Sequence, residues 1–409
     1  MITPFHKKRI VLGVTGSIAA YKAVELASKL AQHGAIIDVI LTQAATNFVT
    51  PLTFQSVTGQ PAFTEQDLWG SQGHVQHIGL ARQANLVVIA PATANTIAKL
   101  AHGIADNLLT VTSLAARSPM ILAPAMDGGM YSHPATQTNL DILRQREISI
   151  IGPIEGHLAS GLSGIGRMVE PIELLGHIRY VLSQRGPLKG RKFIITAGRT
   201  FEAIDPVRGI TNRSSGKQGF ALAQAALDRG ADVILIAGPT NLDTPSGAQR
   251  IDIQSAGEMR DEVLKVIPGS TALIMAAAVA DFRPISPAEH KVKKANGIPD
   301  IKFERTPDIL GEIQNEKAKN GHPQISVGFA AESKDLLRNA RKKLEEKHLD
   351  LIVANDISAS DAGFAVDTNR VTILDAGGGE EVLPLVSKDE VAQFVLERVV
   401  GLLGLSVGE

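Results

Sequence analysis

The segment from Asp205 to Phe220 has residue types and spacings that suit an anion. Its polar side chains include Arg208, Asn212, Arg213, Ser214, Ser215 and Lys217. Glycines allow tight turns, and a following helix would present unpaired N–H groups at its positive end. The triphosphatase phosphate loop needs a glycine where Thr211 stands and Ser or Thr where Gln218 stands. The sequence therefore predicts a phosphate or carboxylate site, between a strand and a helix, that is not an ordinary ATPase site.

The composition narrows the class of protein. A net charge of −1 over 409 residues gives no overall field for nucleic acid or an anionic membrane. The chain has no cysteine, which excludes disulfides and a cysteine nucleophile. No apolar run approaches the ~20 residues of a membrane span. We expect a soluble cytoplasmic protein that acts on small molecules, with no nucleic-acid or membrane partner.

The hydrophobic pattern indicates two α/β domains. Short Val/Ile/Leu runs alternate with helical segments through the first half, as in a doubly wound parallel sheet. The alternation restarts after a basic, turn-rich stretch. We predict a first domain over residues 1–186, a linker over 187–191, and a Rossmann-like second domain over 192–409. Near its end, 369–375 and 380–385 are typical of an antiparallel hairpin before a closing helix.

Three turns of the first domain fall at the predicted ends of strands, where doubly wound folds bind ligands. They contain Gly16 and Ser17, then Pro91 to Asn95, then Met126, and Thr42 ends a further strand. The first turn alone is weak evidence, because any such fold needs a tight turn there. It also lacks the full dinucleotide fingerprint, which disfavours a nicotinamide-dependent reductase.

Taken together, these turns resemble those of the flavin-dependent cysteine decarboxylases. The motifs are Gly-Ser-Ile-Ala, Pro-Ala-Thr-Ala-Asn-Thr and Pro-Ala-Met-Asp. In that family the corresponding turns bind FMN. The resemblance implies the following FMN contacts here: Gly16, Ser17, Thr42, Pro91, Ala92, Thr93, Asn95 and Met126. It also implies oxidation of a substrate thiol by the flavin, loss of carbon dioxide, and return of hydride and a proton.

Three residues are candidates for the decarboxylase chemistry. His77 matches the family's active-site histidine, whose near-neutral titration suits proton transfer. Asp127 stands where many members have Asn, and Ser160 where many have the cysteine that donates a proton. A serine hydroxyl is a far weaker acid than a thiol. One hypothesis is that a protonated Asp127 replaces the missing acid; the competing interpretation is FMN binding with reduced or altered decarboxylation.

Over its whole length the sequence resembles the bacterial bifunctional coenzyme A biosynthesis proteins. These join a phosphopantothenoylcysteine decarboxylase to a phosphopantothenate–cysteine ligase. The ligase activates the pantothenate carboxylate with CTP, releases pyrophosphate, and lets the cysteine amine displace CMP. By matching position, Asn212 holds the acyl-cytidylate, Lys291 supplies positive charge, and Arg208 helps to hold phosphopantothenate. Asp281 faces the nucleotide or its Mg²⁺, Phe329 the base, and Lys343 and Lys347 the triphosphate. The remaining expected substrate contacts are Met275, Ala276, Ala277, Pro307, Asp308, Ile309 and Leu310.

The resemblance also implies a homo-oligomer, with trimeric decarboxylase units joined by ligase dimers. A helical lid over FMN is expected around residues 156–171. Because Asp127 and Ser160 depart from the family pattern, one alternative stays open. The first domain would then be a flavin-binding module, impaired or regulatory, fused to an active ligase.

Overall fold

The computed structural model describes residues 3–68, 76–158, 161, 163–293, 300–332, 334–356 and 367–405. The chain forms two compact units, Met1–Leu182 and Ser183–Glu409. Residues 187–191, the expected linker, pack on the second unit: Leu188 is fully buried and its N–H donates to the carbonyl oxygen of Arg229. No helix of the described ranges has the length and apolar character to cross a membrane.

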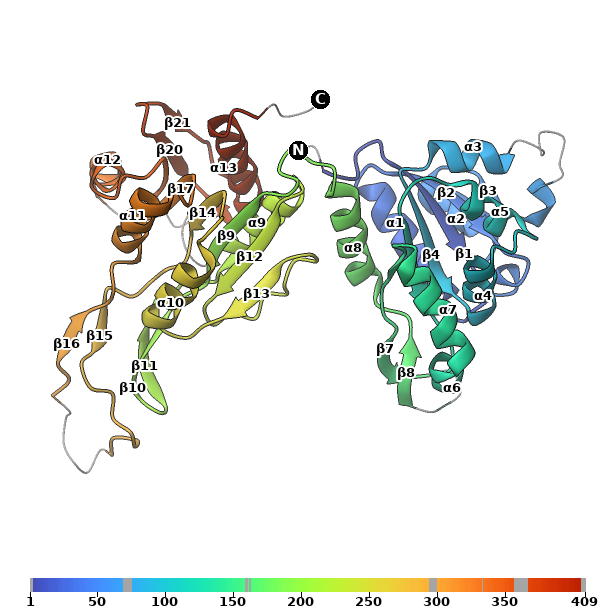
Figure 1. Ribbon diagram of the computed structural model, residues 1–409, viewed down its shortest axis with the longest axis horizontal. Coiled ribbons are helices and arrows are strands. Elements are labelled where there is room, and N and C mark those ends of the chain that lie inside the picture. The colour runs from blue at the N-terminus through green and yellow to red at the C-terminus, as the bar shows by residue number, and fades with distance from the viewer. Residues whose placement is uncertain are drawn as a thin grey trace. The chain divides into compact units, whose positions relative to one another are not determined.

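The first unit has a parallel sheet between two layers of helices (Figure 1). Its strand order is β3-β2-β1-β4-β5-β6. The strands are β1 (Arg9–Val14), β2 (Ile36–Leu41), β3 (Ala62–Phe63), β4 (Leu86–Ala92), β5 (Met120–Pro124) and β6 (Ser149–Ile150). Their runs of buried aliphatic side chains explain the continuous hydrophobic pattern of the sequence, because such strands are covered on both faces.

Each face of this sheet has its own helices. One core contains α1 (Ala20–Gln32), α2 (Pro51–Thr58) and α8 (Pro171–Ser183). The other contains α3 (Gln76–Gln83), α4 (Ala94–His102), α5 (Leu108–Ala115) and α7 (Pro134–Gln145). Alternate β1 residues point to opposite layers, with Leu12 in the first core and Val11 in the second. Short helix α6 (Gly128–Ser132) precedes α7.

The expected helical lid is wrong. β7 (Ile154–His157) pairs antiparallel with β8 (Ser163–Arg167) instead. Three glycines in residues 161–166 give this segment poor helix propensity. At Gly166, with φ +151°, a Cβ would stand 2.2 Å from the carbonyl oxygen of Met126. Only glycine permits this approach, and it brings the hairpin against the end of β5.

The second unit contains a mixed sheet of order β13-β12-β9-β14-β17-β18-β20-β21. All pairs are parallel except β18–β20 and β20–β21. The strands are β9 (Lys192–Ala197), β12 (Asp232–Ala237), β13 (Gln249–Asp252), β14 (Ala272–Met275), β17 (Ile325–Glu332), β18 (Leu351–Asp356), β20 (Val371–Asp375) and β21 (Glu380–Val382). The β20–β21 pair confirms the predicted C-terminal hairpin.

Helices cover this sheet on both sides. Helix α9 (Lys217–Leu227) packs against α13 (Lys388–Leu402), as well as against β9 and β12. The hydrophobic clusters of α10 (Ala256–Val266), α11 (Ile309–Asn320) and α12 (Leu336–Glu346) are joined through Leu310. A short pair, β19 (Thr368–Asn369) with β22 (Val386–Ser387), brings Asn369 next to the start of α13.

Two antiparallel ribbons extend from the second sheet (Figure 1). They are β10 (Phe201–Asp205) with β11 (Arg208–Thr211), and β15 (Phe282–Pro284) with β16 (Phe303–Arg305). The glycines and polar residues after Asp205 predict a simple loop, but this segment forms a hairpin. The Asp205 carboxylate accepts the N–H groups of Val207 and Arg208, and this local bonding closes the turn.

Candidate functional site

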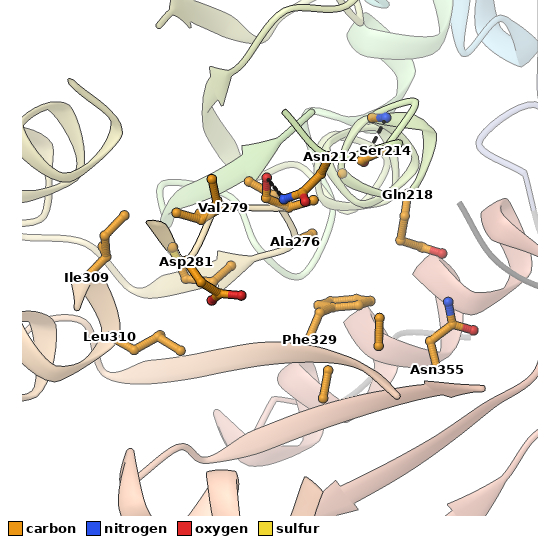
Figure 2. A pocket seen from close by; sticks show the side chains of 18 of the residues that line it. Asn212, Ser214, Gln218, Ala276, Val279, Asp281, Ile309, Leu310, Phe329 and Asn355 are labelled. Atoms are coloured by element: carbon orange, nitrogen blue, oxygen red, sulfur yellow. Dashed lines mark hydrogen bonds between the residues drawn. The ribbon is translucent and has the colours of Figure 1, made fainter. Parts of the chain in front are cut away.

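A cavity of ≈ 830 Å³ lies at the carboxyl ends of β14, β17 and β18 in the second unit (Figure 2). The segment after β11, the turn after β14 and the start of α11 form its walls. Parallel α/β sheets place ligands at this edge. Twelve predicted site residues line it together: Asn212, Met275, Ala276, Ala277, Asp281, Pro307, Asp308, Ile309, Leu310, Phe329, Lys343 and Lys347.

The alanine-rich turn after β14 is fixed by hydroxyl groups from the neighbouring strand region. Thr196 Oγ1 accepts the N–H of Ala277 at 3.2 Å, and Thr200 Oγ1 accepts that of Ala280 at 3.0 Å. Asn212 Nδ2 donates to the Ala278 carbonyl oxygen at 3.0 Å, as Figure 2 shows. Small side chains let a ligand approach this backbone closely, and the Asn212 carboxamide is held at its centre.

Near Leu310, the lysines are already engaged by protein groups. Lys347 Nζ lies 2.5 Å from Asp308 Oδ2, and Lys343 Nζ donates to the Phe329 carbonyl oxygen at 2.9 Å. Asp308 also caps α11 by accepting the Gly311 N–H. Burial would raise the pKa of the Asp308 carboxyl, but the bonds from Lys347 and Gly311 outweigh it and lower that pKa. The positive charge of Lys347 is thus balanced locally.

Asp281 is exposed on the cavity wall. In the part of the chain that the structure describes, no three His, Cys, Asp or Glu side chains are grouped to hold a metal ion. Mg²⁺ in nucleotide enzymes is usually held by one or two carboxylates together with substrate phosphates and water. A single carboxylate at Asp281 fits that pattern, with the nucleotide supplying the other ligands.

Arg208 and Lys291 do not line the cavity. Arg208 binds the buried Asp205 carboxylate and donates to the Val292 carbonyl oxygen at 2.7 Å. Asp205 also accepts the Val292 N–H. Arg208 therefore ties the β10–β11 hairpin to the segment that bears the exposed Lys291. The structure brings these two predicted residues near each other, but not to Asn212's cavity.

In the first unit, the predicted flavin turns meet at the carboxyl edge of the sheet. Thr15 Oγ1 donates to the Pro91 carbonyl oxygen at 2.7 Å and accepts the Thr93 N–H at 3.1 Å. Thr93 in turn caps α4. The turns also contain Gly16, Ser17, Ala92, Asn95 and Met126, while Thr42 follows β2 in the same sheet. Backbone amides, hydroxyls and small side chains of this kind fit a flavin phosphate and a flat ring.

The decarboxylase candidates have different surroundings. His77 lies in the first turn of α3, and its Nδ1 is buried without a hydrogen-bond partner among the described residues. A buried polar atom without a partner suits a group that acts on a ligand. Asp127 is the N-cap of α6 and accepts the Gly129 N–H at 2.9 Å, a role that Asn fills equally well. Ser160 lies outside the described residues.

Sequence reasoning missed the cavity wall formed by Asn369 and Lys388. Both side chains are buried, with exposed fractions of 3% and 7%. Residue 388 appears in sequence as the start of an amphipathic helix. A lysine in the first turn is unfavourable next to the helix dipole, and this was the available signal.

Comparisons with known proteins match both units. The family model "Flavoprotein" matches residues 3–183, and "DNA/pantothenate metabolism flavoprotein C-terminal domain" matches residues 188–402. The chain is 47% identical over 400 residues to the coenzyme A biosynthesis bifunctional protein CoaBC of Bacillus subtilis (strain 168), covering 97% of this chain and 98% of that one. It is 42% identical over 408 residues to CoaBC of Mycobacterium tuberculosis (strain CDC 1551 / Oshkosh), with 97% of each covered.

Two solved structures are similar to one unit each. The C-terminal domain of a CoaBC protein is 38% identical, covers 54% of this chain and 98% of its own, and has a TM-score of 0.46. A PPC decarboxylase mutant complexed with pantothenoylaminoethenethiol is 34% identical, covers 42% of this chain and 97% of its own, and has a TM-score of 0.39. From the near full-length relatives, the chain belongs to the family of bifunctional coenzyme A biosynthesis enzymes, which combine a decarboxylase and a ligase.

Proposed function

We propose that the second unit joins 4′-phosphopantothenate to cysteine with CTP, and that the first unit decarboxylates the product to 4′-phosphopantetheine with FMN. The observation that carries the ligase half is the convergence of Asn212, the alanine turn and the Pro307–Leu310 segment on one cavity. Family membership supports the pairing of the two activities.

In the ligase, the pantothenate carboxylate attacks the α-phosphorus of CTP and pyrophosphate leaves. Negative charge develops on phosphate oxygens, so positioned donors and cations stabilise the transition state. We assign Asn212 to the acyl-cytidylate, since its carboxamide is fixed at the Ala278 carbonyl. Asp281 is assigned to Mg²⁺, Phe329 to the base, and Ala276, Ala277 and Pro307 to Leu310 to the nucleotide. The cysteine amine then displaces CMP.

Arg208 remains in the proposal as a phosphopantothenate contact, and Lys291 as the cation that stabilises negative charge on the phosphate oxygens. Since they lie off the cavity, they need either a movement of the hairpin or a second copy of the chain. We accordingly propose that ligase units pair as dimers. From the family resemblance we also propose that the decarboxylase units form trimers and that the protein acts in the cytoplasm. Sedimentation equilibrium of the full chain tests the assembly, and a monomer at micromolar concentration contradicts it.

In the decarboxylase, FMN would be held by the turns at Gly16 and Ser17, at Pro91 to Asn95, and at Met126, together with Thr42. When bound, it supplies a two-electron acceptor for the substrate thiol and later returns those electrons. His77 is assigned to proton transfer at the substrate because its buried Nδ1 has no partner within the described ranges. Ser160 is proposed to position the substrate.

The proton donor is proposed to be Asp127. Its carboxyl caps α6, so Asp127→Asn keeps the cap and removes only the acid. Carbon dioxide leaves before the proton is returned, so the variant should still release carbon dioxide in a first turnover but form no 4′-phosphopantetheine, with bound flavin retained. Unchanged formation of 4′-phosphopantetheine overturns the assignment. If the wild type binds flavin but releases no carbon dioxide, the alternative of an impaired or regulatory flavin module replaces this half of the proposal.

The experiment that tests the whole function supplies full-length protein with 4′-phosphopantothenate, cysteine, CTP and Mg²⁺, and identifies every product by mass spectrometry. We expect pyrophosphate, CMP, 4′-phosphopantothenoylcysteine, carbon dioxide and 4′-phosphopantetheine. Absence of pyrophosphate defeats the ligase assignment. Yellow colour with a flavin spectrum separates FMN from a nicotinamide cofactor.

A further inference from the structure

The β15–β16 ribbon turns one of its two faces towards the cavity of the second unit. Phe282 on β15 is paired in register with Arg305 on β16, and both line the cavity. The next pair along the ribbon, Arg283 with Glu304, is outside the cavity lining. Directly paired residues of antiparallel strands point to the same face, and successive pairs alternate between faces. The ribbon therefore presents a phenyl ring and a guanidinium to the ligand.

The two arginines of the ribbon differ in their partners. Arg283 Nε donates to Glu304 Oε1 at 2.8 Å, so its charge is balanced on the outer face. Arg305 is exposed, and its guanidinium has no hydrogen bond or ion pair within the described part of the chain. Lys343 and Lys347, on another wall of the cavity, are both engaged by protein groups. The donors of Arg305 are thus available for an anionic ligand.

The backbone at this end of the ribbon is fixed to the turn after β14. Thr306 Oγ1 donates to the Ala280 carbonyl oxygen at 2.6 Å, and the Thr306 N–H donates to that of Asp281 at 3.0 Å. The same turn contains Ala278, whose carbonyl oxygen accepts from Asn212 at 3.0 Å. A ligand held by the ribbon is therefore placed beside the position proposed for the acyl-cytidylate, on a backbone that is already ordered.

Cysteine is the ligase reactant that fits this face of the ribbon. CTP and phosphopantothenate have proposed protein contacts, whereas cysteine so far has none. It carries a carboxylate and a thiol on either side of the amine that must react. A guanidinium matches a carboxylate in charge and in shape, through two parallel N–H bonds. The Phe282 ring is 55% exposed, and an apolar, polarisable sulfur covers such a ring better than a hydroxyl does.

Resting on the proposed ligase function, we propose that Arg305 binds the carboxylate of cysteine and that Phe282 packs against its thiol. The amine between these two groups is then directed at the acyl carbon near Asn212. The neutral amine forms a bond to this carbon, and the bond from the carbon to the CMP oxygen breaks. Its electron pair leaves with CMP, and the amine proton passes to water. Arg305 thus acts in the second half-reaction, after pyrophosphate has left.

Rapid-mixing measurements on the full chain separate the two half-reactions. With 4′-phosphopantothenate, CTP and Mg²⁺ but no cysteine, the acyl-cytidylate forms and pyrophosphate is released in a single burst. Arg305→Gln should leave this burst unchanged and raise the KM for cysteine on the order of tenfold, the size expected for a charge-assisted hydrogen bond. Arg305→Lys should lie between wild type and Arg305→Gln, because an ammonium keeps the charge but not the paired donors.

The ribbon supplies its own matched control. Arg283→Gln removes the same charge from the opposite face, where the arginine is paired with Glu304. This variant should change neither the burst nor the KM for cysteine.

Two substrate analogues identify the groups that are bound. Cysteamine is cysteine without its carboxylate, so the wild type should couple cysteine far more efficiently than cysteamine. Arg305→Gln should lose most of that preference. Phe282→Leu keeps apolar bulk but removes the ring, and it should lower the preference for cysteine over serine severalfold.

An unchanged KM for cysteine in Arg305→Gln overturns the proposal, and so does a preference for cysteine over cysteamine that survives in this variant. A larger rise in the KM for CTP or for 4′-phosphopantothenate also overturns it, since Arg305 then binds that reactant. A wild-type chain that releases no pyrophosphate, with or without cysteine, refutes the ligase itself. Normal release with the same KM for cysteine in wild type and variant refutes only the cysteine site.

Discussion

The two sheets of this chain build different sites at the same edge. In each, the first strand lies centrally, as β1 between β2 and β4 and as β9 between β12 and β14. In the first unit, residues Thr15 to Ala19 connect β1 directly to α1. In the second, the β10–β11 hairpin is inserted between β9 and α9. The shared strand order thus puts each ligand site at the carboxyl edge of its sheet. The connection after the first strand then determines which kind of ligand fits there.

The two sheet edges also differ in the charge and size of the side chains that they present. The first edge presents Thr15, Thr93 and the buried Pro91 and Ala92, which suit a flat ring and one phosphate. The second presents lysines on both sides of its cavity and a helix start without a side-chain cap. Parallel α/β sheets therefore leave charge and hairpin insertions, rather than strand topology, to set specificity.

The largest effect is expected where the second edge is packed most tightly. A Cβ at Gly219 would stand 2.5 Å from Ala197 Cβ and 2.8 Å from Ala197 Cα, so Gly219→Val must push α9 away from β9. We expect a loss of stability on the order of 3 kcal/mol in the second unit. Thermal unfolding measures it, while flavin absorbance should persist. Gly401→Ala in open space on α13 is the control and should not destabilise. If the Gly219 variant lost its flavin, the sites at the two sheet edges would not be independent of each other.

Charge at the second edge should matter next. Asn212→Asp places a carboxylate at the position proposed for the acyl-cytidylate, and pyrophosphate release should fall about 100-fold. Carbon dioxide release from supplied 4′-phosphopantothenoylcysteine should be unaffected. Asn241→Asp, an exposed change outside the cavity lining, is the matched control. Equal loss of both reactions would show that the two edges do not work separately.

A smaller effect is expected at the first edge. Thr93→Ala removes the hydroxyl that caps α4 and contacts Thr96 Oγ1. The same hydroxyl is a proposed FMN contact, and a neutral hydrogen bond contributes about 1 kcal/mol, so we expect FMN to bind roughly fivefold more weakly. Fluorescence titration with FMN measures this, with exposed Thr138→Ala as control. Unchanged FMN affinity would remove Thr93 from the proposed flavin site.

The strand ends and their turns could be predicted from sequence because hydrophobic runs and small-residue motifs are local signals. Their order along the chain carries the resemblance to the ligases, and that resemblance, rather than any single residue, predicts a site at residues 275–281 and 307–310, which line the cavity. The cavity wall at Asn369 and Lys388 depends on the pairing of β19 with β22, two strands of two residues each. Such short strands have no readable periodicity, so their contribution could not be predicted.

The hairpin after Asp205 was also missed, for a related reason. Its register depends on one carboxylate that accepts N–H groups from Val207, Arg208 and the distant Val292. The last bond joins segments 87 residues apart, and no local pattern reveals it. Similarly, the expected lid at residues 156–171 was inferred from resemblance rather than propensity, and the glycines there formed a hairpin.

The smallest effect is expected at the β10–β11 hairpin, as a pH-dependent contribution of Asp205 to the free energy of unfolding. The Arg208 guanidinium, with three backbone N–H groups, holds the pKa of the Asp205 carboxyl well below its usual range. A depressed pKa stabilises the fold above the unfolded value of about 4, and this contribution is lost as pH falls further. Asp205→Asn should therefore be less stable than wild type at pH 7, and the gap should narrow towards pH 3 in urea unfolding. If the difference in the free energy of unfolding stays constant across this range, the charge of Asp205 does not contribute to stability. Because the Val292 N–H donates to the same carboxylate, narrowing of the gap would show that ionised Asp205 stabilises this anchored hairpin, a contribution that the open turn of the first edge lacks.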